Sequence, residues 1–278
     1  MQPKLGILAG SGALPHRLIE YCRETGREFF VIAFDGQTDP DMVSNVPHAW
    51  VRLGAAGTAL EHLKKEGVGE LVMAGGIRRP SLVSLRPDAW AAKLLAKAGV
   101  KAFGDDGLLR AIIRALEEDE GFRVVAAHSL LPDNLAKETV YGSHKPDQQD
   151  SDDITRGIEV ARGIGALDVG QAAVVHQGLV LAVEAIDGTD AMLSRVAGIR
   201  QEEKGGVLVK VRKPGQENRA DLPTVGLDTV KKAFDAGLNG IAVEAGGALI
   251  LDREAAIAEA DTRGLFLLGV TVKGDSCG

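Results

Sequence analysis

Short apolar segments alternate with amphipathic helical segments along the first 130 residues of this 278-residue chain. Residues 4–9, 29–34, 49–53 and 70–74 have the length and composition of strands that are buried on both faces, and a further strand is expected over residues 122–127. Strands separated by helices pair in parallel, because each helix returns the chain to the same end of the sheet. The first half therefore predicts an α/β fold with a Rossmann-like parallel sheet.

A polar stretch, residues 131–150, follows this alternation and contains few large apolar side chains. We expect it to link a domain of residues 1–130 to a second domain of residues 151–278. In the second half, Ser151 is expected to cap a helix, and Gln177-Gly178 to turn a β-hairpin. Strands and helices continue to alternate beyond the hairpin, so the second domain is also predicted to be α/β, with a mixed sheet.

The overall composition excludes several classes of protein. Thirty-two basic and 39 acidic residues give a net charge of −7, which argues against a nucleic-acid partner. The two cysteines, Cys22 and Cys277, form no metal or redox motif, as is typical of a reducing cytoplasm. The N-terminus does not resemble a signal peptide, and no run reaches the roughly 18 apolar residues that span a bilayer. We expect a cytoplasmic protein that is soluble or peripheral to a membrane.

Glycines follow two of the predicted strands. Gly10-Ser11-Gly12 lies between the first strand and the first helix, where backbone amides attract phosphate, and Gly75-Gly76 follows the fourth strand. Asp35, after the second strand, has the position of a ribose-binding acid, but Leu14-Pro15 replaces the third glycine of a dinucleotide fingerprint. Contact with a nucleotide or phosphate and a purely structural turn both remain open.

Two polar runs, 184–192 and 210–226, combine acids with glycine or proline and a small hydroxyl residue, and the second adds cations. Carboxylates beside cations suit a bound phosphate with a metal ion. Two solvated loops with capping residues are the alternative. Since the sequence shows no close histidine pair and no serine nucleophile motif, the acids are the candidates for chemistry.

Residues 78–101 contain six lysines and arginines but only one acid, Asp88. Lys93, Lys97 and Lys101 recur every four residues beside Trp90, as on an amphipathic helix. This segment could face an anionic lipid or substrate, or it could be a solvated helix face with its apolar side in the core.

Longer motifs resemble the LpxI family, the UDP-2,3-diacylglucosamine pyrophosphatases of lipid A biosynthesis. The resemblance covers nearly the whole chain, although the family commonly has three glycines where this chain has Gly10-Ser11-Gly12. The motifs are Leu8-Ala-Gly-Ser-Gly-Ala-Leu-Pro15, Gly104-Asp-Asp-x-Leu-Leu-Arg110, Gln171-Ala-Ala-Val-Val175, Gly178-Leu-Val-Leu-Ala-Val-Glu-Ala185, Gly188-Thr-Asp-Ala-Met-Leu193, Lys213-Pro-x-Gln-Glu-x-Arg-x-Asp-Leu-Pro-Thr224 and Glu244-Ala-Gly246.

The resemblance implies that water cleaves the pyrophosphate of UDP-2,3-diacylglucosamine between two domains. Water would attack the phosphorus nearer the sugar, giving UMP and 2,3-diacylglucosamine 1-phosphate (lipid X). A divalent cation, Mg²⁺ or another such as Mn²⁺, would be required. The enzyme would act as a peripheral protein at the cytoplasmic face of the inner membrane. A homodimer is left open.

Matching the motifs position by position gives the expected site. Asp221 is the first candidate for metal ligand or water activator, Asp190 is a second metal ligand, and Glu244 a third catalytic candidate. Each acid has a structural alternative as a turn former, a helix cap or a solvated strand end. Substrate contacts are expected from Gly10, Ser11, Gly12, Leu14, Pro15, Gly75, Gly76, Asp106, Gln171, Glu184, Thr189, Lys213, Gln216, Arg219 and Thr224.

Two other functional classes remain open at this point. Gly10-Ser11-Gly12 with Asp35 would suit an NAD(P)-linked oxidoreductase. The basic stretch 78–101 would suit a lipid or nucleotide carrier that catalyses no reaction.

Overall fold

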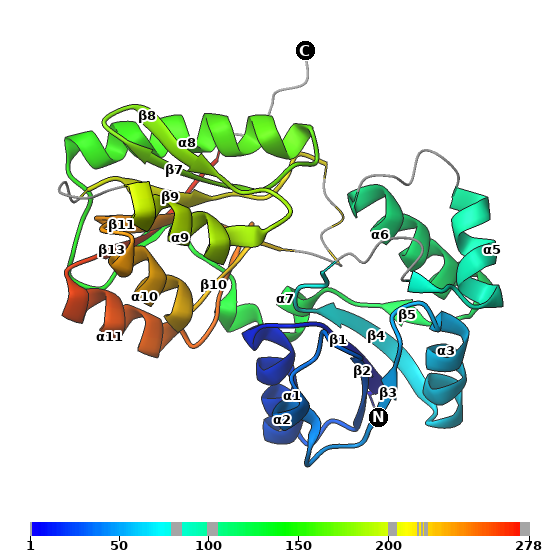
Figure 1. The fold of residues 1–278 in the computed structure, drawn as a ribbon. Coiled ribbons are helices and arrows are strands. Elements are labelled where there is room, and N and C mark those ends of the chain that lie inside the picture. The colour runs from blue at the N-terminus through cyan, green and yellow to red at the C-terminus, as the bar shows by residue number, and fades with distance from the viewer. Residues whose placement is uncertain are drawn as a thin grey trace. The chain divides into compact units, whose positions relative to one another are not determined.

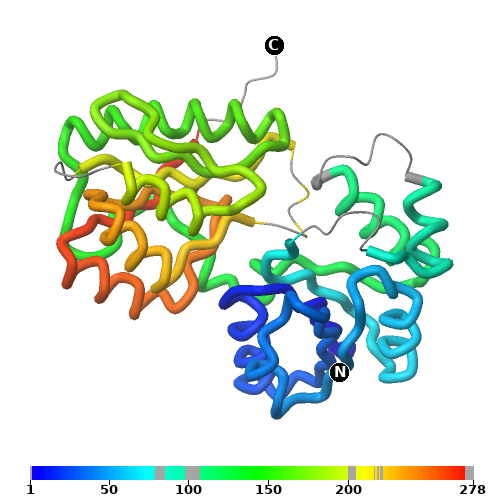
Figure 2. The backbone as a smooth tube through the Cα atoms, in the orientation of Figure 1, coloured from blue at the N-terminus to red at the C-terminus, as the bar shows by residue number. Residues whose placement is uncertain are grey.

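The computed structural model describes residues 2–78, 85–98, 105–199, 205–215, 217, 219 and 222–272, without the side chains of residues 98, 105 and 106. The chain forms two compact units (Figures 1 and 2). The first unit comprises Met1–Pro132 with Glu217–Asp221. The second comprises Asp133–Gln216 with Leu222–Gly278.

The first unit is built on a five-stranded sheet with the order β3-β2-β1-β4-β5, and every pair of neighbours is parallel. This is the Rossmann-like winding predicted from the alternation of strands and helices. The strand expected over residues 122–127 is shorter, because helix α7 begins at Ala127. The strands are β1 (Lys4–Ala9), β2 (Phe29–Phe34), β3 (His48–Val51), β4 (Val68–Ala74) and β5 (Arg123–Val124).

Helices cover both faces of this sheet, which explains why its strands are apolar at successive positions (Figure 1). Leu5 and Ile7 of β1 pack in a core with α1 (Ala13–Thr25), α2 (Pro40–Val43) and α7 (Ala127–Leu130). The opposite core holds Ile32 and Leu71. The elements that contribute to this second core are α3 (Ala56–Lys65), α5 (Ala89–Ala98), α6 (Asp105–Arg114) and η2 (Ala115–Asp119).

The second unit has a six-stranded mixed sheet, as predicted, with the order β6-β13-β11-β9-β7-β8. Strands β9, β11 and β13 are mutually parallel, whereas β6, β7 and β8 pair antiparallel with their neighbours. The strands are β6 (Thr139–Tyr141), β7 (Ala172–His176), β8 (Leu179–Val183), β9 (Val207–Lys210), β11 (Gly240–Glu244) and β13 (Phe266–Val270). A short parallel pair, β10 (Thr224–Val225) and β12 (Leu249–Ile250), lies outside this sheet.

The predicted hairpin joins β7 and β8. Gln177 and Gly178 both have positive φ, 51° and 77°, as a two-residue type I′ turn requires. The buried carboxylate of Asp153 accepts the N–H groups of both residues, at 2.9 and 2.7 Å. Asp153 therefore anchors the turn to helix α8.

Alternate residues of the central strands face opposite helical layers. Ala172 and Val174 lie in the core under α9 (Gly188–Ile199), α10 (Leu227–Asp235) and α11 (Arg253–Arg263), whereas Ala173 lies under α8 (Gln148–Ala166). Figure 1 shows the single helix α8 on one face and the three helices on the other. This arrangement places the ends of β8 and β9 beside the start of α9.

Residues 131–150 differ from the expected linker. They contain the one-turn helix η3 (Pro132–Asn134) and the edge strand β6, in which Tyr141 pairs with Leu267 of β13. Helix α8 also starts earlier than predicted: Asp147, not Ser151, is its N-cap and forms a capping box with Asp150. The side chain of an aspartate accepts a helix N–H as well as that of serine does, so the helix begins after the earlier residue, Asp147.

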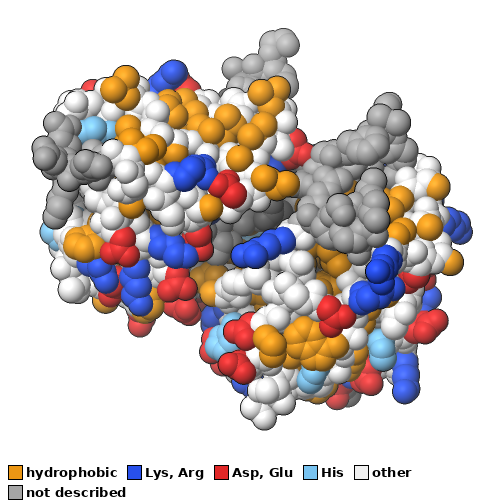
Figure 3. Space-filling view, in the orientation of Figure 1, with side chains coloured by type: hydrophobic (Ala, Val, Ile, Leu, Met, Phe, Trp, Pro, Cys, Tyr) orange, Lys and Arg blue, Asp and Glu red, His pale blue; other side chains and the backbone are white. Residues whose placement is uncertain are grey.

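Strand β8 forms one edge of the second sheet, and its first residues, Leu179 and Val180, are exposed. Figure 3 shows hydrophobic side chains gathered over the part of this unit that Figure 1 labels β8 and α8. Within the described ranges, no helix is long and apolar enough to cross a bilayer.

Candidate functional site

The two glycine turns of the first unit meet at the carboxyl end of the sheet, as predicted. Ser11 N–H donates to Gly76 O at 2.8 Å, and Gly76 N–H donates to Ser11 O at 3.0 Å. The Ser11 hydroxyl also donates to Gly76 O at 3.0 Å. The neighbouring strands β1 and β4 end here together, so the turns that follow them are joined through their backbones.

Close backbone approach explains two of these glycines. A Cβ on Gly10 would lie 2.4 Å from Gly76 O, and a Cβ on Gly75 would lie 2.3 Å from Ser11 O. Gly75 also has a φ of 85°, which disfavours other residues. These glycines are therefore required by the packing of the two turns, whether or not the turns bind a ligand.

Gly12 lies where this edge of the sheet is best suited to bind an anion. It is the N-cap of α1, has a φ of 93°, and no side chain accepts the first N–H groups of the helix. A Cβ at this position would meet nothing within 4 Å. Exposed amides at a helix N-terminus attract anionic groups. Of the other predicted contacts in this turn, Leu14 is partly buried and packs against the core of the unit, and Pro15 is buried.

A polar cluster with two buried members, Glu184 and Lys210, joins the two polar runs. Glu184, which follows β8, accepts the hydroxyl of Thr189 at 2.5 Å. The ammonium of Lys210, the last residue of β9, donates to Thr189 Oγ1 at 2.9 Å and to the carbonyl of Thr224 at 3.1 Å. Three predicted substrate contacts thus lie around one lysine. We call Glu184, Thr189, Lys210 and Thr224 the Lys210 cluster.

Lys210 was not predicted as a site residue, because a lysine at a strand end is usually solvated. Only 5% of its surface is exposed. The only available signal was its position at the end of an otherwise apolar strand, as the first residue of the second polar run. Its hydroxyl and carbonyl partners come from residues 21 positions earlier and 14 positions later, so no local pattern identifies them.

Gln171 lies beside this cluster. Its N–H donates to Glu184 Oε2 at 3.0 Å, and its carbonyl accepts Val211 N–H at 3.0 Å. The side-chain oxygen of Gln171 is buried and accepts no hydrogen bond from the described residues. A donor on a ligand would satisfy this oxygen, and the role of Gln171 as a substrate contact stays a prediction.

Glu244 ends β11 and holds the segment that follows β9. Its carboxylate accepts Arg212 N–H at 2.7 Å, and the Arg212 guanidinium lies 3.8 Å away. Lys213, the next residue, donates from its ammonium to Asp168 at 2.8 Å. These predicted residues therefore flank the same segment, each with a protein partner.

Arg219, which belongs to the first unit, is held by two acids. It donates to Glu117 at 2.8 Å and to Glu217 at 2.9 Å. The hydrogen bond from Arg219 holds the pKa of the Glu217 carboxyl below its ordinary value, and the two acids raise the pKa of Arg219.

Asp190 is exposed on the first turn of α9 and forms an ion pair with Lys232 of α10. The other predicted metal ligand, Asp221, and the predicted contact Gln216 lie outside the described residues, as does the side chain of Asp106. Within the described part of the chain, no three His, Cys, Asp or Glu side chains converge to hold a metal ion. The described residues alone therefore do not make a metal site around Asp190.

The basic stretch contains the amphipathic helix that its spacing predicts. Lys93 and Lys97 of α5 are exposed, and Lys97 lies 3.4 Å from Asp119. Trp90 packs against the core and donates its indole N–H to Glu120 at 2.6 Å. The description of a solvated face with an apolar side in the core fits this helix. Arg79 and Lys101 lie outside the described residues.

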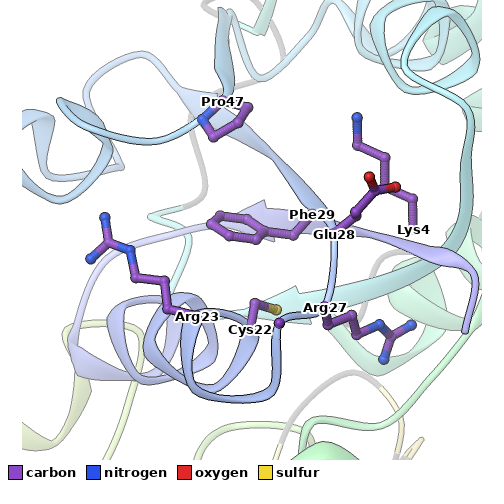
Figure 4. Close-up of a pocket in the computed structure, with 8 residues that line it drawn as sticks. Lys4, Cys22, Arg23, Arg27, Glu28, Phe29 and Pro47 are labelled. Carbon is purple, nitrogen blue, oxygen red and sulfur yellow. The ribbon is translucent and has the colours of Figure 1, made fainter.

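A hollow of about 390 Å³ opens at the amino end of β1 and β2, opposite the glycine turns. In Figure 4 the guanidinium groups of Arg23 and Arg27 point away from each other on either side of Cys22. Burial raises the pKa of the Cys22 thiol to about 11, so this thiol is not a nucleophile at neutral pH. Arg27 is paired with Glu70. The lining residues are Lys4, Cys22, Arg23, Gly26, Arg27, Glu28, Phe29 and Pro47.

Comparison with known proteins gives matches along both units. The profile of the LpxI N-terminal domain matches residues 4–134, and that of the LpxI C-terminal domain matches residues 137–268. The UDP-2,3-diacylglucosamine pyrophosphatase LpxI of Caulobacter vibrioides is 45% identical over 274 residues, covering 96% of this chain and 97% of that protein.

Similarity to solved structures is weaker. CobK precorrin-6A reductase is 14% identical with a TM-score of 0.32, over 99% of this chain and 91% of that one. Isoflavone reductase is 12% identical with a TM-score of 0.30, over 98% and 79% of the respective chains.

Proposed function

The chain belongs to the LpxI family, and we propose from this premise that it hydrolyses the pyrophosphate bond of UDP-2,3-diacylglucosamine in lipid A biosynthesis. The observation that carries the proposal is the similarity to a pyrophosphatase over almost the full length of both chains. The glycine turns of the first unit and the Lys210 cluster of the second both lie within the residues that the two family profiles match.

The proposed reaction is attack by water on the phosphorus nearer the sugar. A bond forms between the water oxygen and this phosphorus, and the bond from the phosphorus to the bridging oxygen breaks. That oxygen leaves with UMP, the sugar keeps its phosphate as lipid X, and the proton of water passes to a base or to solvent. The transferring phosphoryl group needs cations and N–H donors around its oxygens. The amides after Gly12 and the side chains of Lys213 and Arg219 are of this chemical kind.

We also propose a requirement for a divalent cation, Mg²⁺ or Mn²⁺, with Asp221 and Asp190 as ligands. Carboxylates are the ligands that such hard cations prefer, and the cation would neutralise charge on the pyrophosphate. EDTA should abolish turnover and added Mg²⁺ should restore it. Activity that persists in EDTA would exclude the metal requirement while leaving the hydrolysis itself in place.

The direct test incubates the purified protein with UDP-2,3-diacylglucosamine in detergent micelles and Mg²⁺ and measures UMP and lipid X. In H₂¹⁸O the label should enter lipid X and not UMP. Asp221→Asn should lower the rate at least about 100-fold, as expected for a residue that acts in the transition state. Asp228→Asn, at an exposed acid in the first turn of α10, is the matched control and should change the rate little. If the wild-type protein releases no UMP, the proposed function is wrong.

The two acyl chains of this substrate lead us to propose that the protein works at the cytoplasmic face of the inner membrane. The exposed apolar residues Leu179 and Ile186, at β8 and the turn after it, could contact lipid. Co-sedimentation with anionic liposomes tests this. We expect Ile186→Asp to lower the bound fraction and Thr155→Asp, an exposed site on α8, to leave it unchanged. Equal binding by both variants would exclude this surface.

A further inference from the structure

Lys210 is a buried cation with unusual partners. An ammonium group has three N–H donors, and two of these reach the hydroxyl of Thr189 and the carbonyl of Thr224. No carboxylate of the described residues lies within 4.0 Å of its nitrogen. A buried ammonium without a carboxylate at contact distance is unfavourable for folding, because its desolvation is not offset by a direct ion pair. Such a group suggests a role other than stability.

The hydrogen bonds of the Lys210 cluster have a fixed direction. An ammonium can only donate and an ionised carboxylate can only accept, so the Thr189 hydroxyl accepts from Lys210 and donates to Glu184. The hydroxyl is therefore held in one orientation at the second residue of α9. The same helix turn carries Asp190, the predicted metal ligand.

Lys210 also connects the two ends of the second polar run. Lys210 is the last residue of β9, so the segment 211–223 begins at the next residue. Its side chain binds the carbonyl of Thr224, where β10 begins and this segment ends. One side chain thus joins the exit of β9, the entry of β10 and the first turn of α9. The enclosed segment carries Lys213 and Arg219.

We propose that Lys210 is a positioning residue for the hydrolysis, fixing the end of β9, the start of β10 and the first turn of α9 to a common point. This inference rests on the proposed function and goes beyond it, because it assigns a role to a buried residue expected to touch no substrate. Polar groups held in advance lower the barrier of a reaction, because they need not be ordered during it.

Lys210→Met is the first test, since methionine fills a similar volume without the charge. A positioning role predicts that kcat falls about 10- to 100-fold while KM changes less than about threefold. The thermal unfolding midpoint should stay the same or rise, because replacing a buried charge by an apolar group is often neutral or stabilising. Lys145→Met, the same change at an exposed lysine, should alter none of these quantities.

Thr189 supplies an independent variant pair. Thr189→Ser keeps the hydroxyl and should keep kcat within about threefold, whereas Thr189→Val removes it and should lower kcat as Lys210→Met does. Because both residues act through the same contacts, the double variant should lose little more than either single variant. Additive losses would show that the two residues act separately, and the proposal would then be wrong.

Hydrogen–deuterium exchange gives a readout that does not depend on turnover. Amides at the two ends of the segment, in residues 211–215 and 222–225, should exchange faster in Lys210→Met than in the wild type, while those of β11 stay protected. Unchanged exchange in this segment overturns the positioning role, even if the wild type proves inactive on this substrate. A fall in kcat accompanied by a matching loss of unfolding midpoint overturns it too, since Lys210 would then be only structural. A rise in KM alone would make Lys210 a binding residue instead.

Discussion

Arg219 donates from one guanidinium nitrogen to both carboxylate oxygens of Glu117, 102 residues earlier in the chain, at 2.8 and 3.0 Å. The remaining nitrogens of the same guanidinium face Glu217. Glu117 belongs to η2, next to β5, so this contact fixes a residue of the second polar run to the first unit. Arg219 can therefore be held in place before any substrate binds.

Glu117→Gln should lower kcat for UMP release about three- to tenfold, because the amide holds the Arg219 guanidinium less firmly than a carboxylate does. The unfolding midpoint should change by less than about 2 °C, since a partly exposed ion pair contributes roughly 0–1 kcal/mol. Steady-state kinetics and thermal unfolding measure the two effects.

Glu118→Gln is the matched control, because Glu118 is exposed on the next position of η2 and the same charge is removed. It should leave kcat unchanged. If both variants slow the enzyme equally, the effect comes from net charge and Glu117 has no specific role.

The contact between the glycine turns predicts a contrast between two glycines. Gly10→Ala should lower the free energy of unfolding by about 1–3 kcal/mol, because its Cβ would lie 2.4 Å from the Gly76 carbonyl and the backbone must shift. Gly76→Ala should cost less, because its Cβ would meet only the Ser11 hydroxyl, at 3.3 Å. Urea unfolding measures both values. Equal values for the two variants would contradict this account of the turns.

Much of the fold could be predicted from sequence, because the central strands are apolar on both faces and helices of ordinary length separate them. The meeting of Gly10 and Gly75 followed from the same pattern, since parallel strands end at one edge. Strand β6 was missed because it is a short edge strand with polar neighbours. Its pairing with β13 joins residues more than 120 positions apart.

The candidate site was harder to predict than the fold. The motifs identified Glu184, Thr189 and Thr224 as candidate site residues. They did not identify Lys210, around which these residues lie, because the burial of Lys210 depends on tertiary packing. For Asp190 the motif predicts a metal ligand, but the structure shows an ion pair with Lys232 that no motif indicates. Local patterns identify residue types at the ends of strands, whereas partners from other elements decide which of these residues are buried or paired.

The ion pair between Asp190 and Lys232 makes the proposed metal role testable. If Asp190 binds the divalent cation, the Lys232 ammonium competes with that cation for the same carboxylate. Lys232→Met should then lower the Mg²⁺ concentration needed for half-maximal activity about two- to fivefold. Asp190→Asn should raise it.

Titration of activity with Mg²⁺ measures both shifts. Lys231→Met, at the neighbouring position of α10, controls for the general loss of positive charge. An unchanged Mg²⁺ requirement in Asp190→Asn would leave Asp190 as a surface ion pair and remove it from the proposed ligands.

Glu120 should make the stability of the first unit depend on pH. Lys64 and Trp90 donate to its two carboxylate oxygens, each at 2.6 Å, and the Lys64 hydrogen bond is the main reason that the pKa of Glu120 lies below its ordinary value of 4.5. The unfolded chain therefore takes up this proton at a higher pH than the folded one does. The stabilising contribution is complete above about pH 4.5 and is lost as the pH falls through the lowered folded pKa.

Glu120→Gln removes this contribution, so wild type and variant should differ most in free energy of unfolding near pH 6 and least near pH 3. Chemical denaturation followed by tryptophan fluorescence measures this difference, and Trp90 lies within the affected contact. Glu61→Gln, at an exposed position of α3, should show no such pH dependence. A difference of the same size at both pH values would show that the hydrogen bonds to Glu120 do not depend on its ionisation.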